Sequence, residues 1–135
     1  MDLNGLKKLL KRMESVNIRS KNFNVKWVKN ITAVRHFVKD YERFIKPDRE
    51  FEIYLEQYQK AKGKEKLKVK ELFKGAIKRQ REKMRKADEI FSRRPIELEE
   101  FSIDELPSNI DTKTMMLLYE LDLIREGEDE HKNKN

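Results

Sequence analysis

The sequence lacks cysteine altogether and is poor in proline, glycine and histidine, with three, four and two of them among 135 residues. Without cysteine, the chain can form no disulfide, no thiol nucleophile and no zinc finger. So few glycines and prolines leave too few tight turns for a sheet of many strands. The two histidines, His36 and His131, lie far apart in the sequence, so neither a metal site nor a histidine-based catalytic site is expected.

Long apolar runs are also missing. No stretch of 18 apolar residues is present, and the first residues lack the apolar core of a signal peptide. We therefore expect a soluble, cytoplasmic protein that does not bind a membrane. Frequent Lys and Glu without cysteine are typical of thermophile proteins, although eight asparagines oppose that interpretation.

Charged residues outnumber apolar ones, at 42% against 37% of the chain, which is typical of helices with narrow buried stripes and broad solvated faces. The net charge of +7 is unevenly distributed. Residues 60–94 contain 15 basic and 5 acidic side chains, whereas residues 95–135 contain 4 and 12. Such polarity indicates a polyanionic or acidic partner, or an acidic arm that shields the basic surface.

Apolar residues recur at three- and four-residue spacing, the pattern of amphipathic helices. We predict an all-α fold, a bundle of four to five helices with one long basic helix and a short C-terminal helix. It forms a single helical domain over residues 1–127, followed by a disordered charged tail over residues 128–135. The predicted helices cover about residues 2–16, 25–45, 47–63, 64–93 and 112–126.

Helix 25–45 has the widest apolar face and is predicted to form the centre of the core. Residues 17–24 before it are expected to form a connection, and residues 95–110 an irregular or short-helix segment. The core positions of helix 25–45 are Trp27, Ile31, Val34, Val38, Tyr41 and Ile45, widened by Val28 and Phe37. The stripe of the long helix is Val69, Phe73, Ala76, Gln80, Met84, Ala87 and Phe91, with Leu72, Ile77 and Ile90 alongside.

Three aromatic residues share one side of the predicted helix 47–63, namely Phe51, Tyr54 and Tyr58. They fit a base-stacking platform or a packed core. Core packing is favoured, because aromatic residues that stack on bases more often stand on sheets or loops.

No catalytic motif is present. The chain has no Gly-rich phosphate loop, no serine in a nucleophile elbow and no HExxH spacing. The acidic runs 97–100 and 104–105 have the ligand type for a divalent ion, but a solvated acidic face explains them more simply. We predict a non-enzymatic protein without cofactor or metal, and we expect His36 to be a partly exposed helix residue.

The segment "KGAIKRQREKMRKADEIF", residues 74–91, is the strongest candidate for a binding site, with seven basic and three acidic side chains. Four basic residues fall on one ridge of about 16 Å, long enough to contact several phosphates. Three others flank the apolar stripe. The ridge is Lys74, Lys78, Arg81 and Arg85, and the flanking residues are Arg79, Lys83 and Lys86. No pattern predicts base-specific recognition.

Several functions fit this basic helix. A highly charged, solvated face is one interpretation, because Glu82 and Glu89 stand at ion-pair spacing from basic residues. The function we prefer is an accessory factor of replication or transcription that binds the DNA or RNA backbone. The alternatives are a helical scaffold or viral inhibitor that docks on a polymerase, helicase or nuclease, and a self-assembling structural protein that forms a homo-oligomer through the long helix.

The order of segments resembles the α-helical domain of GINS subunits, which belong to the replicative helicase assembly of archaea and eukaryotes. The resemblance rests on "MDLNGLKKLLKRMES", "KNFNVKWVKNI", the basic "ELFKGAIKRQREKMRKADEIF" and "TMMLLYELDLI", and covers about residues 2–126. It implies a scaffold that binds other subunits, a helicase and DNA-associated proteins, without catalytic residues. GINS subunits also carry a small β-rich domain, for which this sequence has neither room nor pattern.

Overall fold

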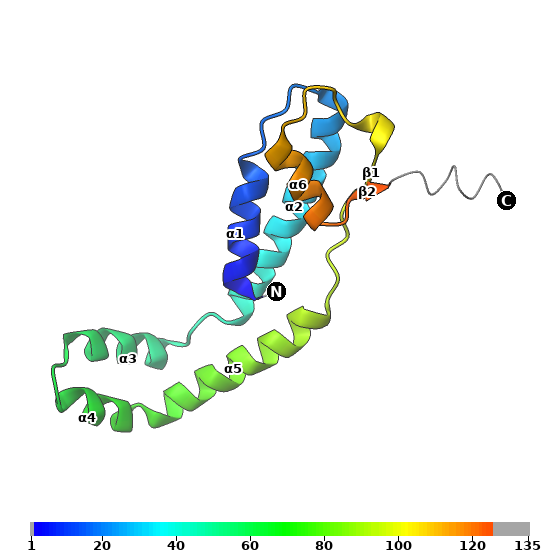
Figure 1. Cartoon of the computed structure of the whole chain (residues 1–135). Helices are drawn as coiled ribbons and strands as arrows, with labels where there is room; N and C mark the ends of the chain where they lie inside the picture. Colours follow the sequence, from blue (N-terminus) through cyan, green and yellow to red (C-terminus); the bar gives the residue numbers. More distant parts are fainter. Residues whose placement is uncertain (1, 126–135) are drawn as a thin grey trace. The chain divides into compact units, whose positions relative to one another are not determined.

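The computed structural model describes residues 2–125, and its regular structure is almost entirely helical (Figure 1). The prediction of an all-α fold is therefore confirmed. The predicted tail, residues 128–135, lies outside the described residues. Within residues 2–125 the α-helices are α1 (Leu3–Glu14), α2 (Lys21–Phe44), α3 (Arg49–Lys60), α4 (Glu65–Leu72), α5 (Lys74–Arg93) and α6 (Thr112–Glu120).

The chain forms two compact units. The first is built from Leu3–Val38 with the described residues from Ile96, and the second from Lys39–Pro95. Helix α2 contributes residues to both. The single domain expected over residues 1–127 stays a prediction, because two compact units of one chain can fold together or separately.

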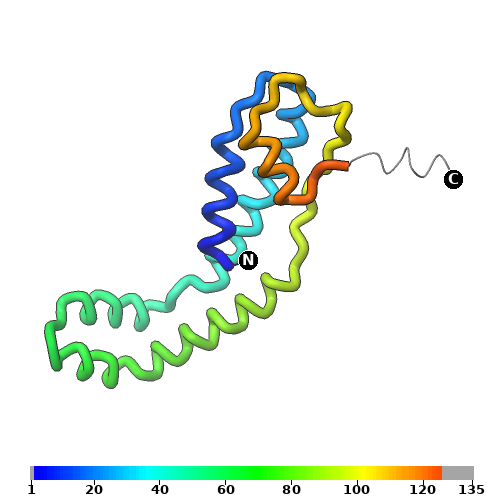
Figure 2. The backbone as a smooth tube through the Cα atoms, viewed as in Figure 1, coloured from blue at the N-terminus to red at the C-terminus, as the bar shows by residue number. Residues whose placement is uncertain are grey.

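The core of the first unit lies among α1, α2 and α6, with α1 and α2 antiparallel and side by side (Figures 1 and 2). The indole of Trp27 donates a hydrogen bond of 2.9 Å to the carbonyl of Met13, which satisfies its polar atom inside the core. The rings of Phe23 and Phe101 stack with centroids 4.9 Å apart. From α6, Leu117 and Leu118 complete this core.

Helix α2 begins at Lys21, so the prediction of a connection through residue 24 is wrong. The hydroxyl oxygen of Ser20 accepts a hydrogen bond from the backbone N–H of Phe23, as an N-cap does. The earlier start places Phe23 in the core. Further along α2, the predicted stripe is buried or half-buried except at Val28, which is 58% exposed.

The acidic segment before α6 is fixed to α2 by a buried asparagine. The side chain of Asn30 is 1% exposed. Its Oδ1 accepts from the N–H of Glu99 at 2.6 Å, and its Nδ2 donates to the Glu99 carbonyl at 3.1 Å. The amide therefore satisfies both polar groups of one peptide residue, as a neighbouring strand would.

Two short strands follow, β1 (Phe101–Ser102) and β2 (Ile124–Arg125), which pair in parallel. Between them lie the 3₁₀ turn η1 (Ile103–Glu105) and α6, so the prediction of an irregular or short-helix segment holds for most of residues 95–110. The pairing draws Phe101 into the core, where it is fully buried.

The carboxylate of Glu105 joins η1 to α2. The Lys26 ammonium lies 2.6 Å from it, and both the backbone N–H and the hydroxyl of Ser102 donate to it. These contacts favour the ionised form, so they lower the pKa of Glu105 to about 2, with the Lys26 hydrogen bond as the largest cause.

The second unit is a helical hairpin in which α3 runs antiparallel to α4 and α5 (Figures 1 and 2). The predicted long helix 64–93 is wrong in one respect, because it is divided at Phe73 into α4 and α5. Phe73 leaves the helical conformation with φ −104° and ψ 23°, and its ring packs 5.8 Å from that of Tyr54 on α3. The Phe73 side chain packs toward α3, and the regular helix is interrupted at this residue.

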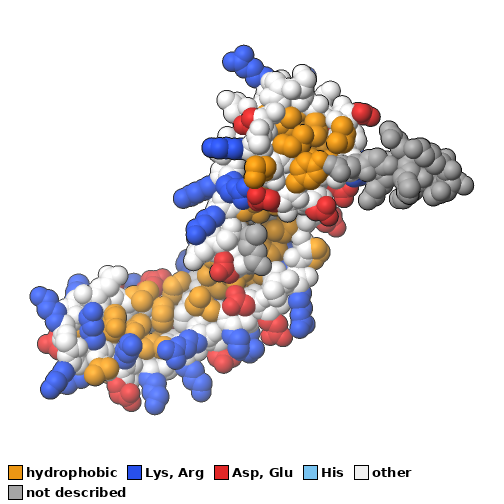
Figure 3. Space-filling model, in the orientation of Figure 1, with side chains coloured by type: hydrophobic (Ala, Val, Ile, Leu, Met, Phe, Trp, Pro, Cys, Tyr) orange, Lys and Arg blue, Asp and Glu red, His pale blue; other side chains and the backbone are white. Residues whose placement is uncertain are grey.

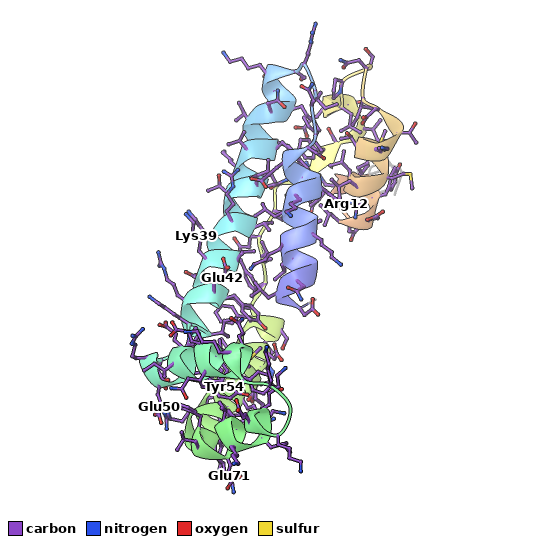
Figure 4. All side chains as sticks on the ribbon, turned by 90° about the vertical axis from the view of Figure 1, so that its left-hand side faces the viewer. Arg12, Lys39, Glu42, Glu50, Tyr54 and Glu71 are labelled. Atoms are coloured by element: carbon purple, nitrogen blue, oxygen red, sulfur yellow. The ribbon has the colours of Figure 1, made fainter. Side chains whose placement is uncertain are left out.

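Aromatic residues hold the hairpin together. Tyr54 is buried between α3 and the α4–α5 layer (Figure 4), with ring centroids 5.4 Å from Phe51 and 5.7 Å from Tyr58. Lys66 and Lys70 lie over the Tyr58 ring at 5.1 and 5.7 Å. These aromatic side chains pack within the unit, as core packing requires.

The other end of α5 packs on the last turns of α2. The rings of Tyr41 and Phe91 stack at 4.7 Å. The Tyr41 hydroxyl donates to the Asp88 carboxylate, and burial together with this contact raises the pKa of Tyr41 to about 12. Arg94 pairs with Asp40 at 2.8 Å. Helix α5 is therefore covered by α3 at its start and by α2 at its end.

The stripe predicted for the long helix is only partly buried. Ala76, Gln80, Ala87 and Phe91 are buried, whereas Met84 is 49% exposed. Leu72 and Ile90, expected alongside, are exposed as well. The hairpin is only two helices deep, so side chains at the edges of the stripe have no second layer to cover them.

Replacing Asn30 with alanine is expected to leave both polar groups of the Glu99 peptide without their partners. The free energy of unfolding should fall by about 1–3 kcal/mol, measured by urea denaturation. Asn22→Ala, on an exposed position of the same helix, is the matched control and should change stability far less. Equal losses for the two variants would contradict the role assigned to Asn30.

Glu105 should make the stability of the protein sensitive to acid. Its folded pKa of about 2 lies below the ordinary 4.5, so its stabilising effect is present above about pH 4.5 and is lost as the pH falls through about 2. Glu105→Gln should show a shallower loss of stability across this interval than the unmodified protein, in urea titrations at stepped pH. Glu97→Gln, an exposed carboxylate of the same segment, should keep the original slope.

Candidate polyanion-binding surface

Three side chains of α5, Gln80, Lys83 and Arg79, make polar contacts with the connection between α2 and α3. Gln80, buried on α5, donates to the Ile45 carbonyl at 2.8 Å. The Lys83 ammonium donates to the Lys46 carbonyl at 2.7 Å. Both carbonyls belong to the two residues that directly follow α2, which ends at Phe44. The basic helix therefore satisfies backbone carbonyls of the connection that leads to α3.

Arg79 extends this contact to the start of α3. Its guanidinium pairs with Asp48 at 3.3 Å and with Glu50. Asp48 is the N-cap of α3, and its carboxylate accepts from the Phe51 backbone N–H at 2.8 Å. That bond, together with Arg79, lowers the pKa of Asp48, while Glu50 and Asp48 raise the pKa of Arg79. Arg79 is thus engaged within the unit.

The predicted ridge of four residues is not uniform. Arg85 pairs with Glu82 at 3.3 Å and with Glu89 at 3.5 Å, which are contacts within its own helix. Lys74, Lys78 and Arg81 are exposed and make no ion pair or side-chain hydrogen bond with any residue in 2–125.

Among the predicted flanking residues, only Lys86 is likewise exposed and unpaired within the described chain. Of the seven basic residues predicted to form the site, four are therefore left for an external anion, and three already bind within the unit.

A shallow cavity of about 500 Å³ lies on the flank of α5 where α2 ends. It brings Lys78 of the ridge together with the three flanking basic residues, which the sequence placed on a separate face. Phe44, the last residue of α2, contributes an aromatic ring. The lining residues are Phe44, Lys78, Arg79, Glu82, Lys83 and Lys86.

The structure adds basic residues that were not predicted for the site. The turn between α3 and α4 contains Gly63 with φ +59°, a left-handed conformation that favours glycine. Around it, four exposed lysines make no ion pair or side-chain hydrogen bond with residues 2–125. They are Lys60, Lys62, Lys64 and Lys68. The alternating lysines of "KAKGKEKLKVK", residues 60–70, could have predicted this basic turn.

Basic side chains dominate the second unit on the face drawn in Figure 3, where they flank a band of apolar side chains. By contrast, the acidic residues directly before β1 pair within the first unit, Glu99 with Lys29 at 3.8 Å and Glu100 with Arg125 at 3.5 Å. On α1, Arg12 reaches toward α6 and pairs with Glu120 at 2.9 Å (Figure 4).

Other candidate sites were checked over the same residues. Among residues 2–125, no group of three or more His, Asp or Glu side chains is placed to hold a metal ion. His36 is exposed on α2, and His131 lies outside the described residues. None of the helices from α1 to α6 is both long and apolar enough to cross a membrane.

Comparison with protein-family models, curated proteins and solved structures finds no match to this chain. The resemblance to the helical domain of GINS subunits therefore stays a prediction.

Gln80→Leu is expected to lower the free energy of unfolding by about 1–3 kcal/mol, because the Ile45 carbonyl loses its donor. Thermal and urea unfolding would measure this loss. Gln59→Leu, at an exposed position of α3, is the matched control. If both variants unfold at the same midpoint as the unmodified protein, the contact between α5 and the α2–α3 connection contributes nothing.

Proposed function

We propose that the second unit binds the phosphate backbone of nucleic acid, without reading base sequence, as a non-enzymatic accessory factor of the replication or transcription machinery in the cytoplasm. The observation that carries this proposal is the set of unpaired cations on α5, namely Lys74, Lys78, Arg81 and Lys86.

The charge of the chain supports this proposal. Residues 39–95 contain 19 basic and 11 acidic side chains, a net charge of +8, against +7 for the whole chain. Several acidic groups of this unit, such as Asp48, Glu50 and Glu82, are already paired with arginines. A unit with this excess attracts polyanions over a distance of about one Debye length, roughly 8–10 Å at physiological salt.

The geometry of α5 favours contact with a backbone. Lys74 and Lys86 are twelve residues apart, which corresponds to about 18 Å along the axis, so the unpaired cations are spread along the helix and do not converge on one point. Cations spread in this way match successive phosphates better than a single small anion. Long, flexible lysines carry no base-specific geometry.

A second candidate, docking on a protein partner, is favoured by helix α4. None of its residues is buried, and Leu67 and Leu72 are 69% and 73% exposed. Apolar side chains beside unpaired lysines suit a partner that is acidic and partly apolar. Self-assembly would use the same apolar residues, and a solution mass independent of protein concentration would argue against it.

The salt dependence of binding tests the proposed function. Replacing Lys74, Lys78, Arg81 and Lys86 with glutamine removes four phosphate contacts. The slope of log affinity against log salt should become shallower by about 3 for a single strand and by about 3.6 for a duplex, measured by fluorescence anisotropy.

The matched control removes the same number of charges from the first unit. Lys8, Lys11, Arg19 and Lys21 are exposed and make no ion pair or side-chain hydrogen bond with the described residues, and their replacement by glutamine should leave the slope within about 1 of its original value. Equal slopes for the unmodified protein and the α5 variant would contradict the proposal. Circular dichroism of both variants checks that they fold.

A further inference from the structure

Phe44 stands apart from the other aromatic residues of its unit. At 36% exposure it is the most exposed aromatic side chain of residues 39–95, whereas Tyr41, Tyr54 and Phe91 are buried. Its ring meets that of Phe91 edge to face, with centroids 5.9 Å apart and planes at 79°. The Phe44 ring therefore packs against Phe91 and also lines the cavity on the flank of α5.

The charges around the cavity are arranged unevenly. Lys78 and Lys86 are unpaired within residues 2–125 and stand eight residues apart, about 12 Å along α5. Glu82 lies between them in sequence and also lines the cavity. Glu82 is paired with Arg85, and the other two lining cations, Arg79 and Lys83, already bind within the unit. Lys78 and Lys86 are therefore the lining residues left to attract anionic groups. The occupant that fits is a flat group that stacks on the Phe44 ring and has an anionic group on either side.

We propose that this cavity takes an unpaired nucleobase stacked on Phe44, while Lys78 and Lys86 hold the phosphates on either side of it. The surface would then prefer single-stranded nucleic acid, since the bases of a duplex stay stacked on one another. This inference rests on the proposed function and adds which form of nucleic acid is bound.

A nucleotide fits because it combines a flat base, which can stack on Phe44, with phosphates, which can pair with Lys78 and Lys86. Stacking on an aromatic side chain accepts any base, which agrees with a set of lysines that reads no sequence. An acidic peptide would pair with the lysines but would leave the Phe44 ring without a stacking partner. The volume of about 500 Å³ lies within the range of small-molecule sites, roughly 300–1,000 Å³, and so has room for one base with its sugar.

Three probes of equal length test the proposal by fluorescence anisotropy: an oligothymidylate, the same strand with abasic sugars, and a duplex. The unmodified protein should bind oligothymidylate about tenfold or more tightly than the abasic strand. Phe44→Leu should remove that difference by weakening only the oligothymidylate complex. Tyr119→Leu, an exposed aromatic residue of α6, should keep it.

A second variant covers the case in which Phe44→Leu loses structure, which circular dichroism and thermal melting would reveal. Phe44→Trp keeps an aromatic ring and adds a fluorophore, while Trp27 is buried and gives a constant background. Oligothymidylate should quench the new fluorescence, and the abasic strand should not.

The outcomes separate the two proposals. If oligothymidylate and the abasic strand bind equally, or if Phe44→Leu weakens both to the same extent, base stacking is overturned while the phosphate contacts stand. If the four-glutamine variant of α5 keeps the full salt slope, the proposed function fails. Preference for polyglutamate over every strand overturns both.

Discussion

The second unit depends on the hydrogen bonds that α5 donates to the α2–α3 connection. Backbone carbonyls in a connection need hydrogen-bond partners, and in the connection after α2 the carbonyls of Ile45 and Lys46 are satisfied by Gln80 and Lys83. Arg79 then neutralises the acids at the start of α3. Gln80, Lys83 and Arg79 on one side of α5 therefore make contacts that stabilise the second unit. The function that we propose for the unit rests on the cations that these contacts leave unpaired within the described residues.

This division separates basic residues that look alike in sequence. Arg79 and Lys78 are neighbours, yet Arg79 is engaged by Asp48 and Glu50 while Lys78 is unpaired within the described residues. The arginines, with several donors each, tend to take structural contacts. Two of the three arginines among the predicted site residues, Arg79 and Arg85, are paired. Most of the charge left for a partner is therefore lysine, which suits loose contact with a backbone.

Helical periodicity predicted the fold class and most of the buried positions of α2 and α5, because a stripe at 3.6-residue spacing depends on local sequence alone. It predicted Trp27 and Ala87 as buried, and both are. It did not predict the break at Phe73. The Phe73 ring packs on Tyr54, which belongs to another helix, and a pattern within one helix does not contain that contact. The start of α2 was missed because the Asn- and Ser-rich sequence around Ser20 resembles a loop, although Ser20 caps the helix.

The sequence predicted which basic residues belong to the candidate site, but it did not predict how they are arranged. The phases of residues on an isolated helix placed Lys78 on the ridge and Lys86 beside the apolar stripe. The cavity that unites them with Phe44 exists because α2 ends there and α3 begins further on, which no pattern within α5 contains. The lysines around Gly63 were visible in the sequence, but only a turn held by the hairpin makes them one cluster.

Helix α4 has a consequence for dynamics. It is eight residues long and has no buried side chain, and the break at Phe73 separates it from the regular hydrogen-bond ladder of α5. Isolated segments of this length are marginal helices in water. Its backbone amides should therefore exchange with solvent much faster than those of α5, as a segment of low local stability does. The lysine-rich turn beside α4 would then change its conformation more readily than α5 does.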